Sequence, residues 1–182
     1  MQRPYSAAGG TLSVYSVEMR LGAAPLKREV YDHGHAAAIL LYNPTRQTVL
    51  LVRQFRVPAL LGGDGGALIE VCAGLLDGHA PEECARQEAV EETGHRPRSI
   101  THVFDAYLSP GSLSEKLHCF VGDYDEDTRV SSGGGIAAEG EEIEVLELPF
   151  ERAYGMIASG EIIDAKTIML LQHARLAGVF PR

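Results

Sequence analysis

The sequence predicts an α/β fold in which helices pack against a mixed β-sheet. Two observations support this prediction. Short apolar or alternating segments recur through most of the chain, as strands do, and segments with helical spacing occur in the middle and twice near the end. Strands followed by helices at both ends of a sheet favour layered packing. With 182 residues the chain is long enough for one domain with a substantial core.

The first half of the chain is expected to consist mainly of strands. Residues 11–20 alternate between apolar and polar side chains, which is typical of a half-buried strand. Two apolar segments further on are joined through the turn-forming pair Asn43-Pro44. The glycine-rich stretch 62–66 between strands is expected to be a surface connection. The predicted strands are 11–20, 27–32, 35–43, 48–55 and 67–74.

Residues 81–93 are predicted to form a helix. Pro81 fits the first helical position, where its missing N–H costs nothing. Glu82 and Glu83 follow in the first turn, where the helix dipole favours negative charge. Gly94 fits the position just past the end, where a left-handed conformation is common.

The second half is expected to add strands and then two closing helices. The helices are predicted from apolar residues at i, i+3 and i+4 spacing. A long loop beginning at 133–135 precedes the last strand, and its length indicates a functional segment. The predicted strands are 99–108, 115–124 and 142–148, and the predicted helices are 150–160 and 165–177.

The central helix carries three glutamates that indicate a metal site. An α-helix turns about 100° per residue, so Glu88, Glu91 and Glu92 share an arc of about 100°. Like charges this close repel each other, so a cation is expected between them. Acidic helices are usually solvated surfaces, but here a cysteine and two alanines lie beside the glutamates, which therefore border the packed face. Mg²⁺ prefers oxygen ligands and often binds carboxylates together with substrate phosphates.

Composition and charge exclude several classes of partner. The net charge of −9 argues against nucleic-acid binding, which needs a basic surface. No apolar run approaches membrane-spanning length and no cationic leader is visible, so we expect a cytoplasmic protein without a membrane partner. Cys72, Cys84 and Cys119 are expected to be reduced, buried thiols. His33 and His35 are expected to share one side of a strand and to be structural.

Residues 74–94, GLLDGHAPEECARQEAVEETG, resemble the box of the Nudix hydrolases. That box has a glycine, a spaced glutamate and then Arg-Glu-x-x-Glu-Glu-x-Gly. The loop here is one residue shorter than the common pattern, His79 falls where an early Glu is usual, and Gln87 falls where Arg is usual. The positions that match in register are Glu88, Glu91, Glu92 and Gly94.

The resemblance covers nearly the whole chain. It is strongest to the nucleoside-diphosphate-sugar branch, most closely to the GDP-mannose hydrolases, with the ADP-ribose pyrophosphatases as near relatives. It implies a Nudix-type α/β/α sandwich with a mixed sheet over residues 35–182, and an N-terminal strand region at 1–34 that takes part in a homodimer. The segments that carry it are KREVYD (27–32), VRQFRVP (52–58), IEVCAGLLD (69–77), YLSPGSLSE (107–115), GGGIAAEGEEIEVLELPF (133–150) and GEIIDAKT (160–167).

The resemblance also implies a Mg²⁺-dependent hydrolysis of a diphosphate bond, with Mn²⁺ left open as the metal. Glu141 is expected to complete the metal cluster or to take the proton from the attacking water, with Glu139 and Glu142 as close rivals. Glu91 is expected to be a supporting or bridging ligand. The implied catalytic residues are Glu91, Glu92 and Glu141, and the implied metal ligands are Glu88, Glu92, Glu141 and the backbone carbonyl of Ala73.

The resemblance implies a nucleotide sugar as substrate, with GDP-mannose as the first candidate, cleaved to GMP and mannose 1-phosphate. Arg56 is expected to bind the phosphates, because a guanidinium can donate two hydrogen bonds to phosphate oxygens at once, which an ammonium does less well. The other expected substrate contacts are Lys27, Arg28, Glu29, Gly74, Leu75, Glu115 and Lys166, the first three from the partner subunit of a dimer. Two alternatives stay open: an ADP-ribose pyrophosphatase with the same chemistry, and a nucleotide-binding regulator that does not hydrolyse, which the changes at His79 and Gln87 favour.

Overall fold

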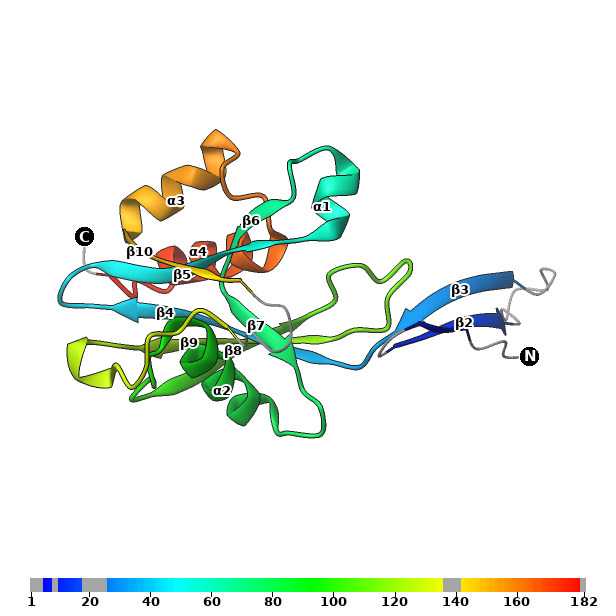
Figure 1. Cartoon of the computed structure of the whole chain (residues 1–182), viewed down its shortest axis with the longest axis horizontal. Coiled ribbons are helices and arrows are strands. Elements are labelled where there is room, and N and C mark those ends of the chain that lie inside the picture. The colour runs from blue at the N-terminus through cyan, green and yellow to red at the C-terminus, as the bar shows by residue number, and fades with distance from the viewer. Residues whose placement is uncertain (1–4, 8–9, 18–25, 136–141, 181–182) are drawn as a thin grey trace.

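The computed structural model of the chain describes residues 5–7, 10–17, 26–135 and 142–180, with side chains from residue 28 onward. Its strands form two separate sheets. The smaller is an antiparallel sheet in the order β1-β2-β3, and it extends from one end of the molecule (Figure 1). Its strands are β1 (Tyr5–Ala7), β2 (Gly10–Val17) and β3 (Leu26–Asp32).

The larger sheet has seven strands and is mixed. Its main path runs in the order β10-β5-β4-β9-β8, while β6 pairs with β5 and β7 pairs with β4. The β4–β9 pair is parallel and the other pairs are antiparallel. The strands are β4 (Ala36–Asn43), β5 (Thr48–Phe55), β6 (Ala67–Glu70), β7 (Cys72–Leu75), β8 (Ile100–Ala106), β9 (Leu117–Asp123) and β10 (Glu144–Pro149).

Helices cover both faces of this sheet, which gives three layers (Figure 1). One face packs against α2, and the other packs against α3 and α4. The predicted α/β/α sandwich with a mixed sheet is therefore confirmed. The helices are α1 (Val57–Gly62), α2 (Pro81–Thr93), α3 (Phe150–Ser159) and α4 (Ala165–Leu176), with a short 3₁₀ helix at Glu126–Thr128.

Strand β4 is the centre of the core because it is buried on both faces. Successive strand side chains point to opposite faces, so a strand covered on both sides is apolar throughout. Ala38 and Leu40 pack on the side of α3 and α4, whereas Ala37 and Ile39 pack on the side of α2. All four are fully buried. The small alanines of β4 let the helices approach closely where the strand begins.

The structure corrects two of the predicted elements. The single strand expected at 67–74 is broken at Val71, where the chain crosses from β5 to β4 and the Val71 N–H donates to Thr167 Oγ1 at 2.8 Å. Helix α1 was not predicted, because it is short and includes Pro58 in its first turn. Gly63 follows the helix as its C-cap, with a φ of 95°. The glycine stretch expected to join two strands thus joins α1 to β6.

None of the helices in the described part of the chain is long and apolar enough to cross a membrane.

Candidate active site

Helix α2 begins and ends where the sequence predicts. Pro81 lies in the first turn together with two glutamates. Gly94 follows the helix with a φ of 79°, and its N–H donates to the Val90 carbonyl at 2.9 Å. A Cβ on Gly94 would overlap the backbone of Ser131. Glycine is therefore required at this end for its conformation and for the close approach of a second segment.

The three α2 glutamates differ in exposure. Glu92 is buried, with 3% of its surface exposed, while Glu88 is partly buried and Glu91 is exposed. At about 100° per residue, the buried cysteine and alanines of α2 point in the same direction as Glu92. Glu88, about 40° from Glu92, lies within the arc of these buried residues but is only partly buried, and Glu91, about 100° from Glu92, lies at the edge of that arc. The helix thus presents two of the three carboxylates to the sheet.

Glu88 lies directly against β7. A Cβ built on Gly74 would overlap the Glu88 carboxylate, so the missing side chain of Gly74 leaves the space that this carboxylate fills. Cys72 lies two residues earlier on the same strand and therefore faces α2 as well. Its thiol pKa is raised, first by complete burial and then by the negative charges of Glu92 and Glu88. The carboxylates of Glu88 and Glu92 therefore converge on the same short strand.

These residues fit a hard divalent cation. The charged donors in this part of the site are carboxylate oxygens, and the neighbouring Cys72 thiol is fully buried. Oxygen donors of this kind suit Mg²⁺ or a similar ion, whereas a thiolate would favour zinc. A cation would also relieve the repulsion between Glu88 and Glu92. The residues would then supply the two carboxylates that Mg²⁺ typically accepts from a protein.

Glu91 lies apart from the other two glutamates. It lines a hollow on the outer side of α2 with Arg86 and Arg96. Among the described residues, the ligand atoms of the three α2 glutamates do not form a group within 4.8 Å of one another. The bridging role predicted for Glu91 stays a prediction.

The glycine-rich segment 133–135 is attached to the last turn of α2. Gly134 N–H donates to the Glu92 carbonyl at 2.8 Å, and Gly135 N–H donates to the Glu91 carbonyl at 3.1 Å. All three glycines have positive φ, and a Cβ on Gly133 would press on the α2 backbone. The long loop predicted here therefore starts beside Glu92. Of the three candidate glutamates in that loop, Glu142 is exposed, while Glu139 and Glu141 lie outside the described residues.

A cavity of about 260 Å³ gathers most of the predicted substrate contacts. It opens at the end of the sheet where β7 follows β6. Six residues predicted for substrate or metal binding line it, although they come from four separate parts of the sequence. They are Arg56, Ala73, Gly74, Leu75, Glu115 and Lys166.

Glu70 holds the two cations of this cavity and was not predicted. It accepts hydrogen bonds from Arg56, Nε to Oε1 at 2.8 Å and Nη2 to Oε2 at 2.9 Å, and Lys166 Nζ pairs with its Oε2 at 2.5 Å. Only 1% of the Glu70 side chain is exposed. Its position was available in the sequence as the one charged residue within the apolar run ALIEVCAG. A charge in such a strand needs a partner, which is a usable signal.

The electrostatics of Arg56 connect the cavity to α2. The pKa of Arg56 is raised, chiefly by its hydrogen bonds to Glu70 and further by the negative charges of Glu92 and Asp164. Asp164 also accepts a hydrogen bond from Lys166 at 3.0 Å and caps the first turn of α4. The guanidinium and ammonium thus lie between buried carboxylates and an open cavity. That placement suits phosphate binding between cations and metal.

Glu115 lines the same cavity and pairs with His33, Nε2 to Oε2 at 3.5 Å. The expectation that His33 and His35 share a strand face is wrong, because β3 ends at Asp32 and both histidines follow it. His35 has a structural contact, since its Nδ1 accepts from the Lys116 N–H at 3.1 Å. His33 instead faces the cavity, and sequence reasoning missed this.

The predicted contacts on β3 are not among the described residues that line this cavity. Arg28 and Glu29 are exposed, and both lie on the smaller sheet. Lys27 belongs to the same strand, and its side chain is outside the described residues. The expectation that these three reach a site in the partner subunit stays a prediction.

All three cysteines are buried and free, which confirms that prediction. Cys84 anchors the start of α2, because its Sγ lies 3.3 Å from the Leu75 carbonyl. Its pKa is raised to about 11, first by burial and then by Glu88.

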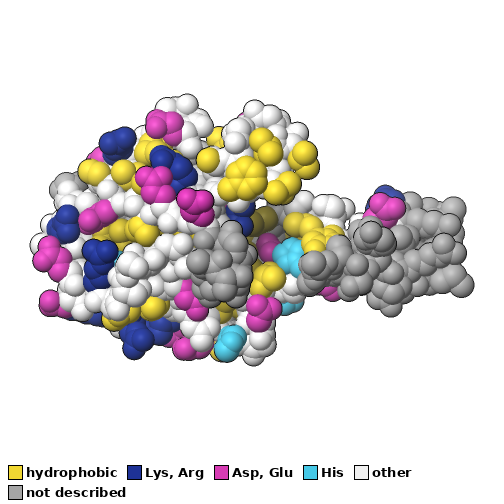
Figure 2. Space-filling view, in the orientation of Figure 1, with side chains coloured by type: hydrophobic (Ala, Val, Ile, Leu, Met, Phe, Trp, Pro, Cys, Tyr) yellow, Lys and Arg dark blue, Asp and Glu magenta, His cyan; other side chains and the backbone are white. Residues whose placement is uncertain are grey.

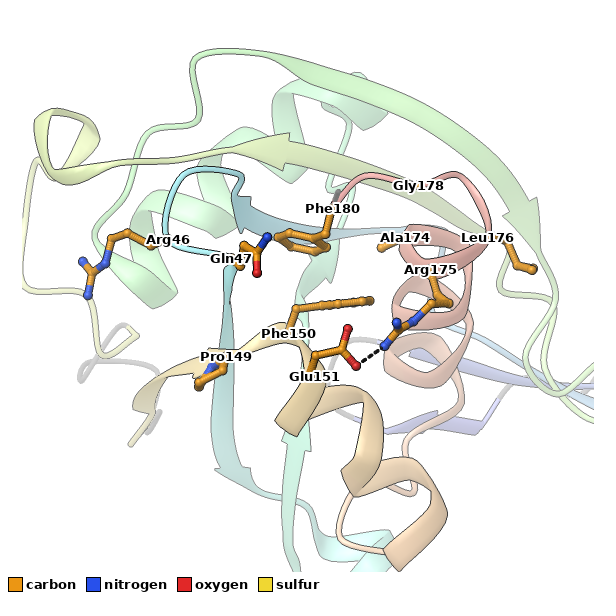
Figure 3. Close-up of a pocket in the computed structure, with 10 residues that line it drawn as sticks. All are labelled: Arg46, Gln47, Pro149, Phe150, Glu151, Ala174, Arg175, Leu176, Gly178 and Phe180. Carbon is orange, nitrogen blue, oxygen red and sulfur yellow. Dashed lines mark hydrogen bonds and ion pairs between the residues drawn. The ribbon is translucent and has the colours of Figure 1, made fainter. Parts of the chain in front are cut away.

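A second hollow of about 270 Å³ lies at the opposite end of β5, between the β4–β5 turn and the ends of α3 and α4. Figure 3 shows the stacked rings of Phe150 and Phe180 in its lining, with Arg175 paired to Glu151. The ring centroids are 4.3 Å apart and the ion pair spans 2.7 Å. Neither the α2 glutamates nor the Arg56 cavity reaches this hollow, and we assign no chemistry to it.

Similarity to known proteins agrees with this site. The chain is 55% identical to a GDP-mannose pyrophosphatase of Pectobacterium atrosepticum over 156 residues, covering 85% of this chain and 80% of that protein. It is 52% identical to a GDP-mannose pyrophosphatase of Cronobacter sakazakii, covering 84% and 80%. It is 55% identical to a GDP-mannose pyrophosphatase of Salmonella typhimurium, covering 81% and 76%.

The family model of the NUDIX domain matches residues 32–171. This range contains α2, the seven-stranded sheet and the Arg56 cavity described above. With relatives of this identity over most of its length, the chain belongs to the Nudix family.

Proposed function

We propose that the protein is a metal-dependent pyrophosphohydrolase that cleaves GDP-mannose to GMP and mannose 1-phosphate. The observation that supports this most directly is the convergence of the Glu88 and Glu92 carboxylates on β7, next to a cavity lined by Arg56 and Lys166. The names of the relatives supply the substrate, since proteins more than half identical to this chain are GDP-mannose pyrophosphatases.

The metal would be held by Glu88 and Glu92, with the Ala73 carbonyl and Glu141 as further oxygen ligands. A divalent cation suits this family, and we propose Mg²⁺ because the charged donors are carboxylates. When bound, such an ion offsets phosphate charge and lowers the pKa of a coordinated water. Mn²⁺ shares this preference for oxygen donors and is the second candidate.

The cations of the cavity have the complementary role. Arg56 and Lys166 neutralise and orient the diphosphate from the side facing away from α2, while buried Glu70 keeps both head groups in place. Glu141 accepts the proton from the attacking water. Glu91, at the exposed border of α2, is the supporting or bridging ligand of this carboxylate set.

The most direct test is a panel of nucleotide sugars. Purified protein is incubated with Mg²⁺ and equal concentrations of GDP-mannose and ADP-ribose, and released nucleoside monophosphate is measured for each. We expect GDP-mannose to be turned over preferentially. A preference for ADP-ribose would identify the alternative pyrophosphatase, and tight binding without product would identify a non-hydrolysing regulator.

A second test addresses the carboxylates. Glu88→Gln keeps the size of the side chain and removes its charge, so it should bind substrate and turn it over at least about a hundredfold more slowly. Glu83→Gln is the matched control, because Glu83 is exposed in the first turn of the same helix. Near-normal turnover by Glu88→Gln would refute the metal role.

We further propose that the protein acts as a homodimer in the cytoplasm. Free cysteines are typical of a reducing compartment. Exposed apolar side chains gather over α1 near the cavity (Figure 2), and Phe55, Val57 and Leu61 are 59%, 55% and 82% exposed. A patch of this kind marks an interaction surface. Light scattering should give twice the mass of the chain, and Leu61→Glu should shift it toward the monomer.

A further inference from the structure

A β-bulge brings three potential metal ligands together on β8 and β9. The pairing of these strands shifts between His102 and Phe104, so that His102 faces Phe120 and Asp105 faces His118. In a regular strand, residues three apart point to opposite faces. The extra residue in the bulge reverses this, and His102 and Asp105 point to the same face as His118.

The three side chains meet at one carboxylate oxygen. Asp105 Oδ1 lies 2.7 Å from His102 Nε2 and 2.8 Å from His118 Nδ1. The three ligand atoms all lie within 4.8 Å of one another, and within the described ranges no other trio of histidine, cysteine or acidic side chains does so. The fourth neighbour, Lys116 Nζ, lies 3.3 Å from the other oxygen, Oδ2.

The surroundings hold the trio in place. The His102 ring packs against Phe120 with the centroids 5.3 Å apart. The Asp105 side chain is 36% exposed, so solvent reaches the site from the β8 side. The His118 side chain on β9 is only 15% exposed, so it is held by its surroundings. One carboxylate flanked by two imidazoles is a donor set that matches transition metals.

We propose that His102, Asp105 and His118 form a second metal site that binds Zn²⁺ through two imidazole nitrogens and one carboxylate oxygen. Three protein ligands of this kind leave one tetrahedral position for water. The ion would replace the hydrogen bonds that the two rings now make to Asp105. It would also join edge strand β8 to β9.

This site is separate from the α2 glutamates. His118 on β9 pairs with Ala37 on the neighbouring strand β4, and Ala37 pairs in turn with Gly74 on β7. Two strand spacings, roughly 10 Å, therefore separate the backbone of His118 from that of Gly74. The two sites also differ in chemistry: nitrogen donors select Zn²⁺ here, whereas the carboxylates of α2 suit Mg²⁺.

The test is calorimetric titration of the tag-free protein with Zn²⁺ in the presence of saturating Mg²⁺, which keeps the glutamate site occupied. We expect one Zn²⁺ per chain. His118→Ala and the conservative Asp105→Asn should each weaken this binding at least tenfold. Lys116→Gln should strengthen it several-fold, because it removes a positive charge beside the ion. His79→Ala removes an exposed histidine outside the trio and should leave Zn²⁺ binding unchanged.

Two further measurements distinguish a specific loss of Zn²⁺ binding from misfolding of the variant. The Mg²⁺-dependent hydrolysis rate of His118→Ala should stay within about twofold of wild type, which shows that the variant is folded. Bound Co²⁺ should give the visible absorption of a four-coordinate ion in wild type and not in Asp105→Asn. Equal Zn²⁺ affinity in wild type and His118→Ala would overturn the proposal, and so would loss of Zn²⁺ binding in Glu88→Gln.

Discussion

Arg56 and Glu70 form a two-point ion pair at the floor of the cavity, Nε to Oε1 at 2.8 Å and Nη2 to Oε2 at 2.9 Å. This geometry fixes the plane of the guanidinium as well as its position. Lys166 shares the same carboxylate, so one buried anion sets the location of both cavity cations. Under the proposed function, Glu70 is a positioning residue that would act on the substrate through Arg56 and Lys166.

Removing the charge of Glu70 should weaken catalysis, although Glu70 itself is not expected to contact the substrate. Glu70→Gln should lower kcat/KM about tenfold, chiefly by raising KM, because Arg56 and Lys166 lose their common anchor. Glu70→Ala should also destabilise the fold by about 3 kcal/mol, since it leaves Lys166 buried without that partner. Steady-state kinetics and urea unfolding measure the two effects. Glu144→Gln breaks the exposed pair of Glu144 with Arg53 and should change both quantities little.

Acid should weaken the same network. Burial raises the pKa of Glu70, but the hydrogen bond from Arg56 and the charges of Lys166 and Arg56 outweigh it, so the folded-state pKa lies below its usual value. A lowered folded pKa means that Glu70 stabilises the protein above the unfolded-state pKa of about 4.3 and that this stability is lost as pH falls. The difference in unfolding free energy between wild type and Glu70→Gln should therefore shrink from pH 7 toward pH 3. A constant difference over that range would contradict the assignment.

Gly74→Ala should disturb the metal ligands selectively. The new methyl group would occupy the place of the Glu88 carboxylate, which has to move away from β7. We expect at least about a tenfold loss of kcat/KM and a higher Mg²⁺ concentration for half-maximal activity. Gly155→Ala in α3 is the control, because nothing lies within 4 Å of its added methyl. That change should preserve activity and raise stability by about 0.5–1 kcal/mol.

The exposure difference along α2 predicts unequal effects of neutralising its glutamates. Glu92→Gln removes a buried charge that the site would use directly, so turnover should fall by at least about a hundredfold. Glu91→Gln acts at the exposed border, so its effect on the Mg²⁺ requirement should be smaller than that of Glu92→Gln. Titrating Mg²⁺ in kinetic assays of both variants compares them. An equal or larger shift for Glu91→Gln would show that Glu91 is a direct ligand.

The elements with strong local signals were predictable. Helix α2 has the predicted start at Pro81 and the predicted glycine after its end, because proline and glycine act through local backbone geometry. Strand β4 was recognisable as an apolar run. The break at Val71 was not, because it depends on tertiary pairing, in which the chain leaves β5 for β4. Helix α1 was not, because it is short and has Pro58 in its first turn.

The sequence predicted most of the residues that line the site, but not how they are placed relative to one another. Arg56, Glu115 and Lys166 were expected to contact substrate, and they line one cavity. Helical spacing grouped Glu91 with Glu88, but Glu91 is exposed whereas Glu88 lies against Gly74 of β7, a contact that depends on how α2 packs on the sheet. Glu70 was missed because its partners are far away in the sequence, 14 residues for Arg56 and 96 for Lys166.

Hydrogen bonds attach residues 133–135 to the last turn of α2, which fixes the point where the chain leaves the helix. The chain leaves the helix at Gly135 and returns as β10 at Glu144, which pairs with Arg53 of β5. Both attachment points belong to the scaffold that carries Glu88 and Glu92. A change of chain length between Gly135 and Glu144 would therefore leave the packing of α2 against the sheet unchanged.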